Sequence, residues 1–196
     1  MDDKVDKHLI LVELNLPHHQ DIEIGSDSPE ALRAPTVQHI DSDEHELIRL
    51  YAEGKRDFSG ANLPQASLNG VCLEKARLIM ANLSEAEMSA AKLNGTRLSM
   101  ANLAKANLQN AELVGATLHG ADLSNADLSN ADLRAADLRS TNLGGANLLG
   151  ANLLGAKLVG AKMNNMTKIE DNWRLIWKIV NPDQDSTPED PTGTGS

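Results

Sequence analysis

From Phe58 onward, every fifth residue of the chain is large and apolar. The series runs to Met163 without insertion or slip and comprises 22 positions, most of them leucine. Two residues before each lies a small residue, nearly always alanine; the exceptions are Arg56, Val71, Thr96 and Thr141. The consensus is Ala-(Asn/Asp)-Leu-x-x. The chain therefore contains an internal repeat of five residues, and this repeat decides its architecture.

A period of five fits neither regular secondary structure. An α-helix turns by about 100° per residue, so a five-residue step moves the leucines around the helix axis. In a straight strand, an odd step sends successive leucines to opposite faces. The backbone must therefore turn a corner once per repeat, with Ala and Leu inside and the neighbours of Leu outside. Glycine is frequent at the fifth position, from Gly60 to Gly160, and suits such tight corners. The period predicts an all-β solenoid.

The repeats of residues 56–166 resemble those of the pentapeptide repeat family, in which Ala-(Asp/Asn)-Leu-x-x recurs. The resemblance implies a right-handed quadrilateral β-helix with four repeats per coil, which gives this chain about 5.5 coils. Residues 20 positions apart, such as Leu78 and Leu98, then lie in one column.

Flanking residues predict helical caps at both ends, which stacked coils need because their last layers are open. Residues 41–55 begin with Asp41-Ser42-Asp43-Glu44 and end near Gly54, which predicts an N-terminal capping helix. Residues 167–182 predict a C-terminal capping helix with one apolar stripe. The side chains expected to cap the coils are Leu47, Leu50, Tyr51, Trp173, Ile176, Trp177 and Val180.

Two further segments complete the predicted domain organisation. Residues 1–40 form an N-terminal extension, for which partial order and flexibility both stay open. Residues 183–196 are rich in Pro, Asp, Thr, Ser and Gly, and this composition predicts a disordered tail. The sequence Trp-Arg-Leu-Ile-Trp-Lys-Ile-Val-Asn after the repeats resembles tails found in many cyanobacterial members of the family.

Composition narrows the function classes. Hydrophobic residues make up 41% of the chain but aromatic residues only 2%, which indicates a narrow core of Leu and Ala. The one cysteine, Cys72, excludes an internal disulfide framework and fits a reducing compartment. No stretch approaches the roughly 20 apolar residues of a membrane span. We therefore expect a soluble, cytoplasmic protein without a membrane partner.

The net charge of −10 raises the hypothesis of DNA mimicry, because some family members that bind DNA gyrase present an acidic surface shaped like a duplex. Residues 56–166, however, carry nine acidic and ten basic residues, so the repeats have a net charge of +1. DNA carries one negative charge per about 1.7 Å. A DNA-mimicking modulator of gyrase or topoisomerase therefore stays the alternative interpretation. Direct nucleic-acid binding is not expected, because the repeats lack a basic stripe with interleaved aromatic residues.

The repeats present no pattern typical of catalysis or metal binding. His119 and Cys72 each neighbour a core leucine, so they face outward. Four aspartates occupy equivalent outward positions of successive repeats: Asp122, Asp127, Asp132 and Asp137. They lie on different sides of a coil, so one calcium ion cannot reach all of them; we expect Arg134 and Arg139 to pair with the last two. We therefore expect no enzyme, no cofactor and no metal.

Two groups of apolar residues stand out on a surface otherwise rich in Ser, Asn, Asp and Lys. The first group lies on one side of the predicted stack: Ile79, Met80 and Met100, flanked by Arg77 and Arg97. A protein-binding surface and tolerated scatter at corners are both open interpretations of this group. The second group, near the C-terminal end, is Leu149, Leu154 and Val159. It either packs beneath the tail or supports a homodimer, as in gyrase-binding relatives.

The absence of a catalytic pattern, together with the rigid display of surface residues, predicts a non-enzymatic protein-binding scaffold or regulatory protein. The sequence does not name its protein partner.

Overall fold

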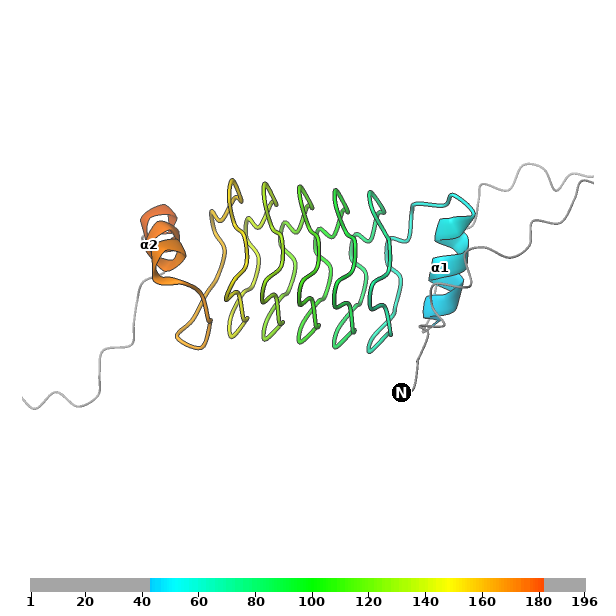
Figure 1. The fold of residues 1–196 in the computed structure, drawn as a ribbon, viewed down its shortest axis with the longest axis horizontal. Coiled ribbons are helices and arrows are strands. Elements are labelled where there is room, and N and C mark those ends of the chain that lie inside the picture. Colours follow the sequence, from blue (N-terminus) through cyan, green and yellow to red (C-terminus); the bar gives the residue numbers. More distant parts are fainter. Residues whose placement is uncertain (1–42, 182–196) are drawn as a thin grey trace, which may run out of the picture. The chain divides into compact units, whose positions relative to one another are not determined.

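The computed structural model describes residues 43–181. Within them, helix α1 (Glu44–Ala52) precedes the repeats and helix α2 (Asp171–Val180) follows them (Figure 1). Between the helices, isolated parallel β-bridges join residues 20 positions apart, beginning with Asp57 and Arg77. Because each repeat has five residues, every coil has four sides. The repeats form a right-handed quadrilateral β-helix, so the predicted fold class is confirmed.

The interior consists almost entirely of leucine and alanine. Every large residue of the five-residue series from Phe58 to Leu158 is buried, and most have no exposed surface. Threonine replaces alanine at two positions, and its hydroxyl then hydrogen-bonds inside the stack. Thr96 Oγ1, for example, donates to the carbonyl of Leu73 at 2.9 Å. A buried polar group is tolerated here because its hydrogen bond is made.

Backbone hydrogen bonds hold each coil to its neighbours in a fixed pattern. In the repeat around Leu83, the N–H of Asn82 donates to the preceding coil at 2.8 Å. The N–H groups of Leu83 and Glu85 donate to the following coil at 2.7 and 2.9 Å. The N–H of Ala86 closes the corner by donating to the carbonyl of Leu83 at 3.2 Å. In repeats that have a coil on both sides, four of the five backbone donors are satisfied in this way.

The fifth donor explains why Asn or Asp precedes leucine in the consensus. Ser84 N–H, at the first corner position, donates to Oδ1 of Asn82 at 3.3 Å. The same contact, from a backbone N–H to a side-chain oxygen two residues earlier, occurs in eleven repeats. It is the Asx-turn geometry, which Asn and Asp favour. These side chains therefore stabilise corners, a role that the repeat pattern alone did not reveal.

The second corner position has positive φ in every repeat from residue 60 to residue 160. Glycine occupies nine of these positions and other residues, including Ala90 and Met100, the remaining twelve. A hydrogen-bonded four-residue turn with positive φ at its third residue has the features of a type II β-turn. Non-glycine residues in this region carry backbone strain, so the corners store strain that the interior must offset.

Helix α1 closes the N-terminal end of the stack. The side chain of Asp43 caps the helix by accepting from the N–H groups of His45 and Glu46, at 3.0 and 3.1 Å. Leu47 and Leu50 belong to the same buried cluster as the coils, and Tyr51 packs against it partly buried. The helix lies inside the predicted range 41–55 and uses the predicted capping residues.

The C-terminal boundary differs from the prediction. One extra residue after Met163 shifts the register, and Thr167 and Ile169 then take the Ala and Leu positions of a further repeat. Lys168 accordingly bridges Asn147, 21 positions away instead of 20. The solenoid thus continues beyond residue 166, so the predicted boundary at residue 167 is wrong: the helix α2 lies inside the predicted range 167–182 but begins only at Asp171.

Helix α2 covers the last coil with side chains that replace a missing next coil. Trp177 is buried, and its Nε1–H donates to the carbonyl of Ala161 at 2.8 Å. Asn181 Oδ1 accepts from the N–H of Gly160 at 2.6 Å. These side chains satisfy backbone groups that would otherwise be an open sheet edge.

The predicted apolar stripe of α2 is only partly correct. Trp173 and Trp177 pack on the core, whereas Ile176 is 42% exposed, so its predicted capping role is wrong. The roll of α2 that directs Trp177 toward Ala161 turns the adjacent Ile176 side chain toward solvent. The side chain of Val180 and the segments predicted for residues 1–40 and 183–196 lie outside the described residues. Neither described helix is long and apolar enough to span a membrane.

Candidate protein-binding surface

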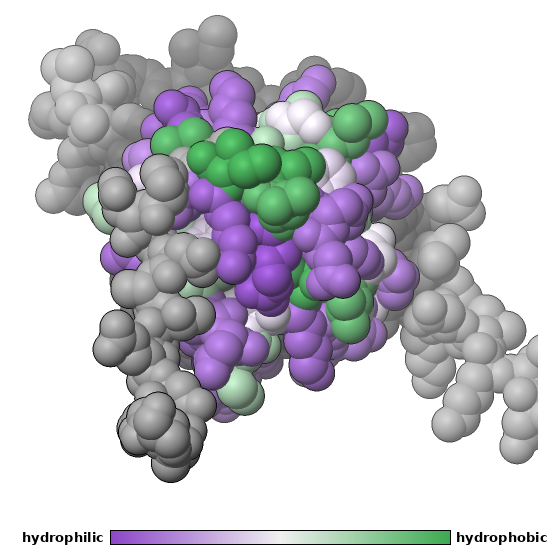
Figure 2. Space-filling model, turned by 90° about the vertical axis from the view of Figure 1, so that its left-hand side faces the viewer, coloured by the Kyte–Doolittle hydropathy of each residue, from purple (hydrophilic) through white to green (hydrophobic). Residues whose placement is uncertain are grey.

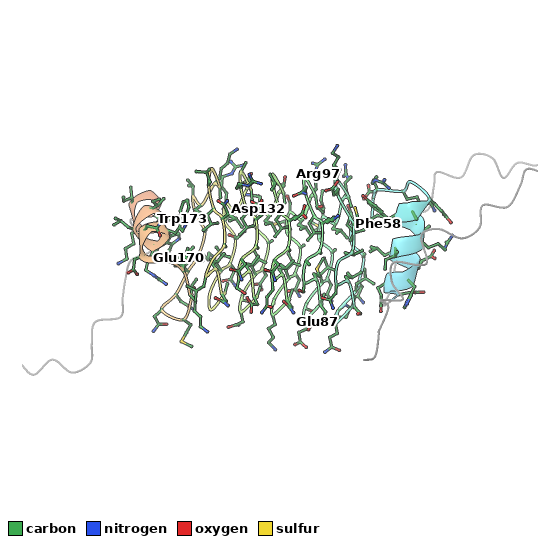
Figure 3. The ribbon with its side chains drawn as sticks, viewed as in Figure 1. Phe58, Glu87, Arg97, Asp132, Glu170 and Trp173 are labelled. Carbon is green, nitrogen blue, oxygen red and sulfur yellow. The ribbon has the colours of Figure 1, made fainter. Side chains whose placement is uncertain are left out.

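Stacking places outward residues of successive coils in columns on four sides. The first side comprises residues 56–60, 76–80, 96–100, 116–120, 136–140 and 156–160. The third side comprises residues 66–70, 86–90, 106–110, 126–130, 146–150 and, after the extra residue, 167–170. Arg97 belongs to the first side and Glu87 to the third, and their side chains point in opposite directions from the stack (Figure 3).

Charge is distributed unevenly between these sides. The first side carries five basic and two acidic residues, a net charge of +3. With the further repeat at residues 167–170, the third side carries three acidic residues, Glu87, Asp127 and Glu170, and one basic residue, Lys168, a net charge of −2. Acids and bases balance on each of the other two sides. The near-neutral solenoid is therefore electrically polarised, with a basic side opposite an acidic side.

The first predicted group lies on the basic side. Arg77 and Arg97 are bridge partners in adjacent coils, and Met80 and Met100 occupy corners next to them. Both methionines are exposed, at 67% and 57%. Ile79 is half-buried, so it contributes less surface than the sequence suggested. We call Arg77, Arg97, Met80 and Met100 the Arg–Met patch.

Corner geometry fixes where the methionine side chains project. Met80 and Met100 have φ of 58° and 60°, the left-handed conformation of all these corners. A Cβ built on Gly120, the next corner of that column, would lie 2.5 Å from Sδ of Met100. The Met100 side chain therefore lies across Gly120. A residue larger than glycine at position 120 would need the space that this side chain fills.

The two arginines have different environments. Nε of Arg77 lies 3.3 Å from Oδ2 of Asp57. Hydrogen bonds from Ser59 lower the pKa of Asp57, and the charge of Arg77 lowers it further. Among residues 43–181, the guanidinium of Arg97 has no ion pair or hydrogen-bonding partner. Arg97 is therefore the less neutralised cation of the patch.

The second predicted group surrounds the C-terminal end. Leu149, Leu154 and Val159 are exposed, because α2 packs on the core and does not cover them. On α2 itself, Leu175 and Ile179 are also exposed. Viewed from that end, Figure 2 shows hydrophobic side chains gathered into a patch among hydrophilic ones. Helix α2 therefore does not cover this group; because residues 182–196 lie outside the described part of the chain, packing beneath the tail and self-association both stay predictions.

The two side chains considered for catalysis, His119 and Cys72, face outward as predicted. His119 and Cys72 are exposed. The hydroxyl of Tyr51 lies 3.9 Å from Cys72 Sγ and donates to the carbonyl of Glu74 at 3.1 Å. Burial raises the pKa of Tyr51. Within the described part of the chain, no group of three or more His, Cys, Asp or Glu side chains could hold a metal ion.

The predicted ion pairs on the outer aspartates are confirmed. Arg134 contacts Asp132 at 2.7 Å and Arg139 contacts Asp137 at 2.6 Å. Hydrogen bonds from these arginines lower the pKa of each aspartate. Each pair closes on its own side of the coil, so the aspartates stabilise corners and do not form a shared site.

Comparison with known proteins agrees with this geometry. The family described as "Pentapeptide repeats (8 copies)" matches residues 57–78, 70–99, 81–120, 101–139 and 126–165. The chain belongs to the pentapeptide repeat family. Members of this family are typically non-enzymatic repeat proteins. A comparison with curated proteins found no significant match.

Solved pentapeptide repeat proteins are similar to this chain over its repeats. Rfr23 from the cyanobacterium Cyanothece 51142 is 31% identical over 64% of this chain and 98% of its own, with a TM-score of 0.47. The protein alr5209 from Nostoc Pcc 7120 is 38% identical over 71% of this chain and 94% of its own, with a TM-score of 0.35. QnrB1, a plasmid-mediated fluoroquinolone resistance protein, is 19% identical over 57% of both chains, with a TM-score of 0.30. These scores add no argument about function.

Proposed function

We propose that this pentapeptide repeat protein is a non-enzymatic scaffold that binds another protein through the Arg–Met patch. The observation that carries the proposal is the departure of this patch from the Ser- and Asn-rich surface around it. Methionine adapts to irregular partner surfaces, and arginine is enriched where proteins bind one another. Because backbone hydrogen bonds to both neighbouring coils hold the patch, binding orders little of the protein, which reduces its entropic cost.

The test compares one pair of methionine substitutions with a single control substitution. Met80→Ser combined with Met100→Ser should weaken capture of the native partner at least tenfold without changing the far-ultraviolet circular dichroism spectrum. Met166→Ser is the matched control, because Met166 is equally exposed, at 68%, but lies at the C-terminal end. Equal capture by the double variant and the wild type would exclude the patch.

The alternative function, a DNA-mimicking modulator of gyrase, has weaker support. A protein that mimics DNA needs a dense acidic surface, because DNA is densely charged. Only the third side of this solenoid is acidic, with a net charge of −2. A supercoiling assay at micromolar protein decides this alternative directly. We expect no inhibition of supercoiling and no protection of gyrase.

We also propose that the exposed apolar residues of the C-terminal end support self-association. Leu154 and Ile179 are the most exposed leucine and isoleucine of this end, at 67% and 69%. Sedimentation velocity should show dimers that Leu154→Ser combined with Ile179→Ser converts to monomers. A monomeric wild type at 100 μM, a concentration of about the order at which weak interfaces form, would contradict this proposal.

A further inference from the structure

The cationic part of the Arg–Met patch is confined to two coils. The outward column of the first side reads, from the N-terminal end, Asp57, Arg77, Arg97, Thr117, Asp137 and Lys157. An acidic residue thus bounds the arginine pair at one end, and a neutral and then an acidic residue bound it at the other. The pair spans one interval of about 4.8 Å between neighbouring strands. A ligand with two anionic groups at this spacing matches it, and a long polyanion does not.

Two like charges in register on adjacent strands repel each other. Asp57 relieves this repulsion at Arg77, at 3.3 Å, whereas Arg97 acts on Asp57 only through its charge and forms no ion pair with an acidic side chain among the described residues. A carboxylate supplied from outside would therefore remove an unfavourable interaction and form a charge-assisted hydrogen bond with a planar guanidinium. Arg97 is the residue of the patch at which an anionic group gains most.

The methionines determine what must accompany the carboxylates. Met80 and Met100 form an exposed apolar strip along the corner beside the arginines, in the same two coils. A free dicarboxylate would leave this strip in water, whereas a protein segment with an apolar side chain next to its acids would cover it. Burying apolar surface contributes roughly 25 cal/mol per Å². The complementary partner is thus both acidic and amphipathic.

The spacing favours a helix over a strand in that partner. Side chains at i and i+4 of a helix have Cβ atoms about 5–6 Å apart, close to the 4.8 Å interval of the arginines. Side chains on one face of an extended strand recur at about 6.7 Å, which fits the pair less well. We infer that the Arg–Met patch binds an amphipathic acidic helix, with two carboxylates one helical turn apart on Arg77 and Arg97 and an apolar side chain on Met80 and Met100.

This inference rests on the proposed function, and methyl spectroscopy separates the two. The probe is a 16-residue helical peptide with one Glu pair at i and i+4 beside a leucine ridge. Full-length protein carrying ¹³C-methyl methionine is titrated with it. The Met80 and Met100 resonances should shift, the buried Met88 should not, and the exposed but distant Met166 should not. Equal shifts at Met166 would indicate nonspecific apolar adhesion and would overturn the inference.

Charge variants complete the experiment. Arg97→Glu should weaken peptide binding at least tenfold, Arg97→Lys should weaken it less, and Arg134→Glu, on another side of the coil, should leave it unchanged. A peptide with Gln in place of both Glu residues should bind at least tenfold more weakly. Equal binding of the two peptides, or no shift with either, overturns the inference. The proposed function would still stand if Met80→Ser with Met100→Ser weakens capture of the native partner.

Discussion

A glycine-to-alanine exchange at a corner measures the strain of the solenoid backbone. Gly115 has φ of +65°, and a Cβ at this residue would meet no atom within 4 Å. Gly115→Ala therefore changes the backbone energy without a steric clash. An L-residue in the left-handed region costs about 1–2 kcal/mol, and loss of glycine flexibility in the unfolded chain offsets about 0.4–1 kcal/mol. The net loss of stability should lie between about 0 and 1.6 kcal/mol, with a central value of about 0.8 kcal/mol.

The reverse exchange should have the opposite sign. Ala90 occupies the equivalent corner position with φ of 55°, so Ala90→Gly should stabilise the protein by a similar amount. Ala104 occupies the first corner position of its repeat, which does not have positive φ. Ala104→Gly is therefore the control and should lower the stability of the protein. Thermal unfolding followed by circular dichroism should show shifts of about 2–4 °C per kcal/mol. If Gly115→Ala raised the melting temperature, or Ala90→Gly lowered it, the corner strain argument would be refuted.

Three further predictions concern the core, the C-terminal cap and acid stability. Leu118→Ala should lower the free energy of unfolding by about 2–5 kcal/mol because it leaves a cavity in a fully buried column, measured by urea unfolding. Trp177→Phe should cost about 1–3 kcal/mol by leaving the carbonyl of Ala161 without its donor, and hydrogen exchange should accelerate first in the last coil. Stability should fall as the pH drops below about 4, because Arg139 holds the pKa of Asp137 below its ordinary value of 3.8, so the folded state binds that proton less readily than the unfolded chain.

Each of these predictions has a matched control. Ser124→Ala, at the surface, should change stability by under about 0.5 kcal/mol. Ile176→Ala should leave exchange in the last coil unchanged, because Ile176 is exposed. Asp137→Asn should reduce the loss of stability on acidification, since its stabilising contribution is present above the unfolded pKa and disappears as the pH falls through the folded pKa. An unchanged pH profile for Asp137→Asn would contradict the role of that pair.

Much of the fold followed from local sequence. The period of five required a corner in every repeat, so the burial of Leu83 and Leu118 could be predicted without knowing the number of sides. The cap at Asp43 and the buried Leu47 followed from helix-start signals and spacing. The number of sides and the hand came instead from the family resemblance, because the period is compatible with other closed coils.

The candidate surface was less accessible to sequence reasoning. The grouping of Arg77 with Arg97 depends on 20 residues per coil, which the sequence supplied only through the family resemblance and which the pairing between coils establishes. The exposure of Ile176 could not be read from spacing, because helical periodicity gives a stripe but not the roll of the helix that places Trp177 on Ala161. The five-residue period ends at Met163 in the sequence. Because one extra residue interrupts it, the period alone did not predict the further repeat in which Thr167 and Ile169 take the Ala and Leu positions.

The sequence by itself determined which residues face inward, because that choice depends on alternation within five consecutive residues and is the same in every repeat. Tertiary structure decided which outward residues become neighbours, since two residues far apart in the chain meet only where separate coils hydrogen-bond in register. The polarity of the solenoid, with Arg97 on one side and Glu87 on the opposite side, is a property of that stacking (Figure 3). A surface assembled from several coils is therefore set by long-range register, whereas the core beneath it is set locally.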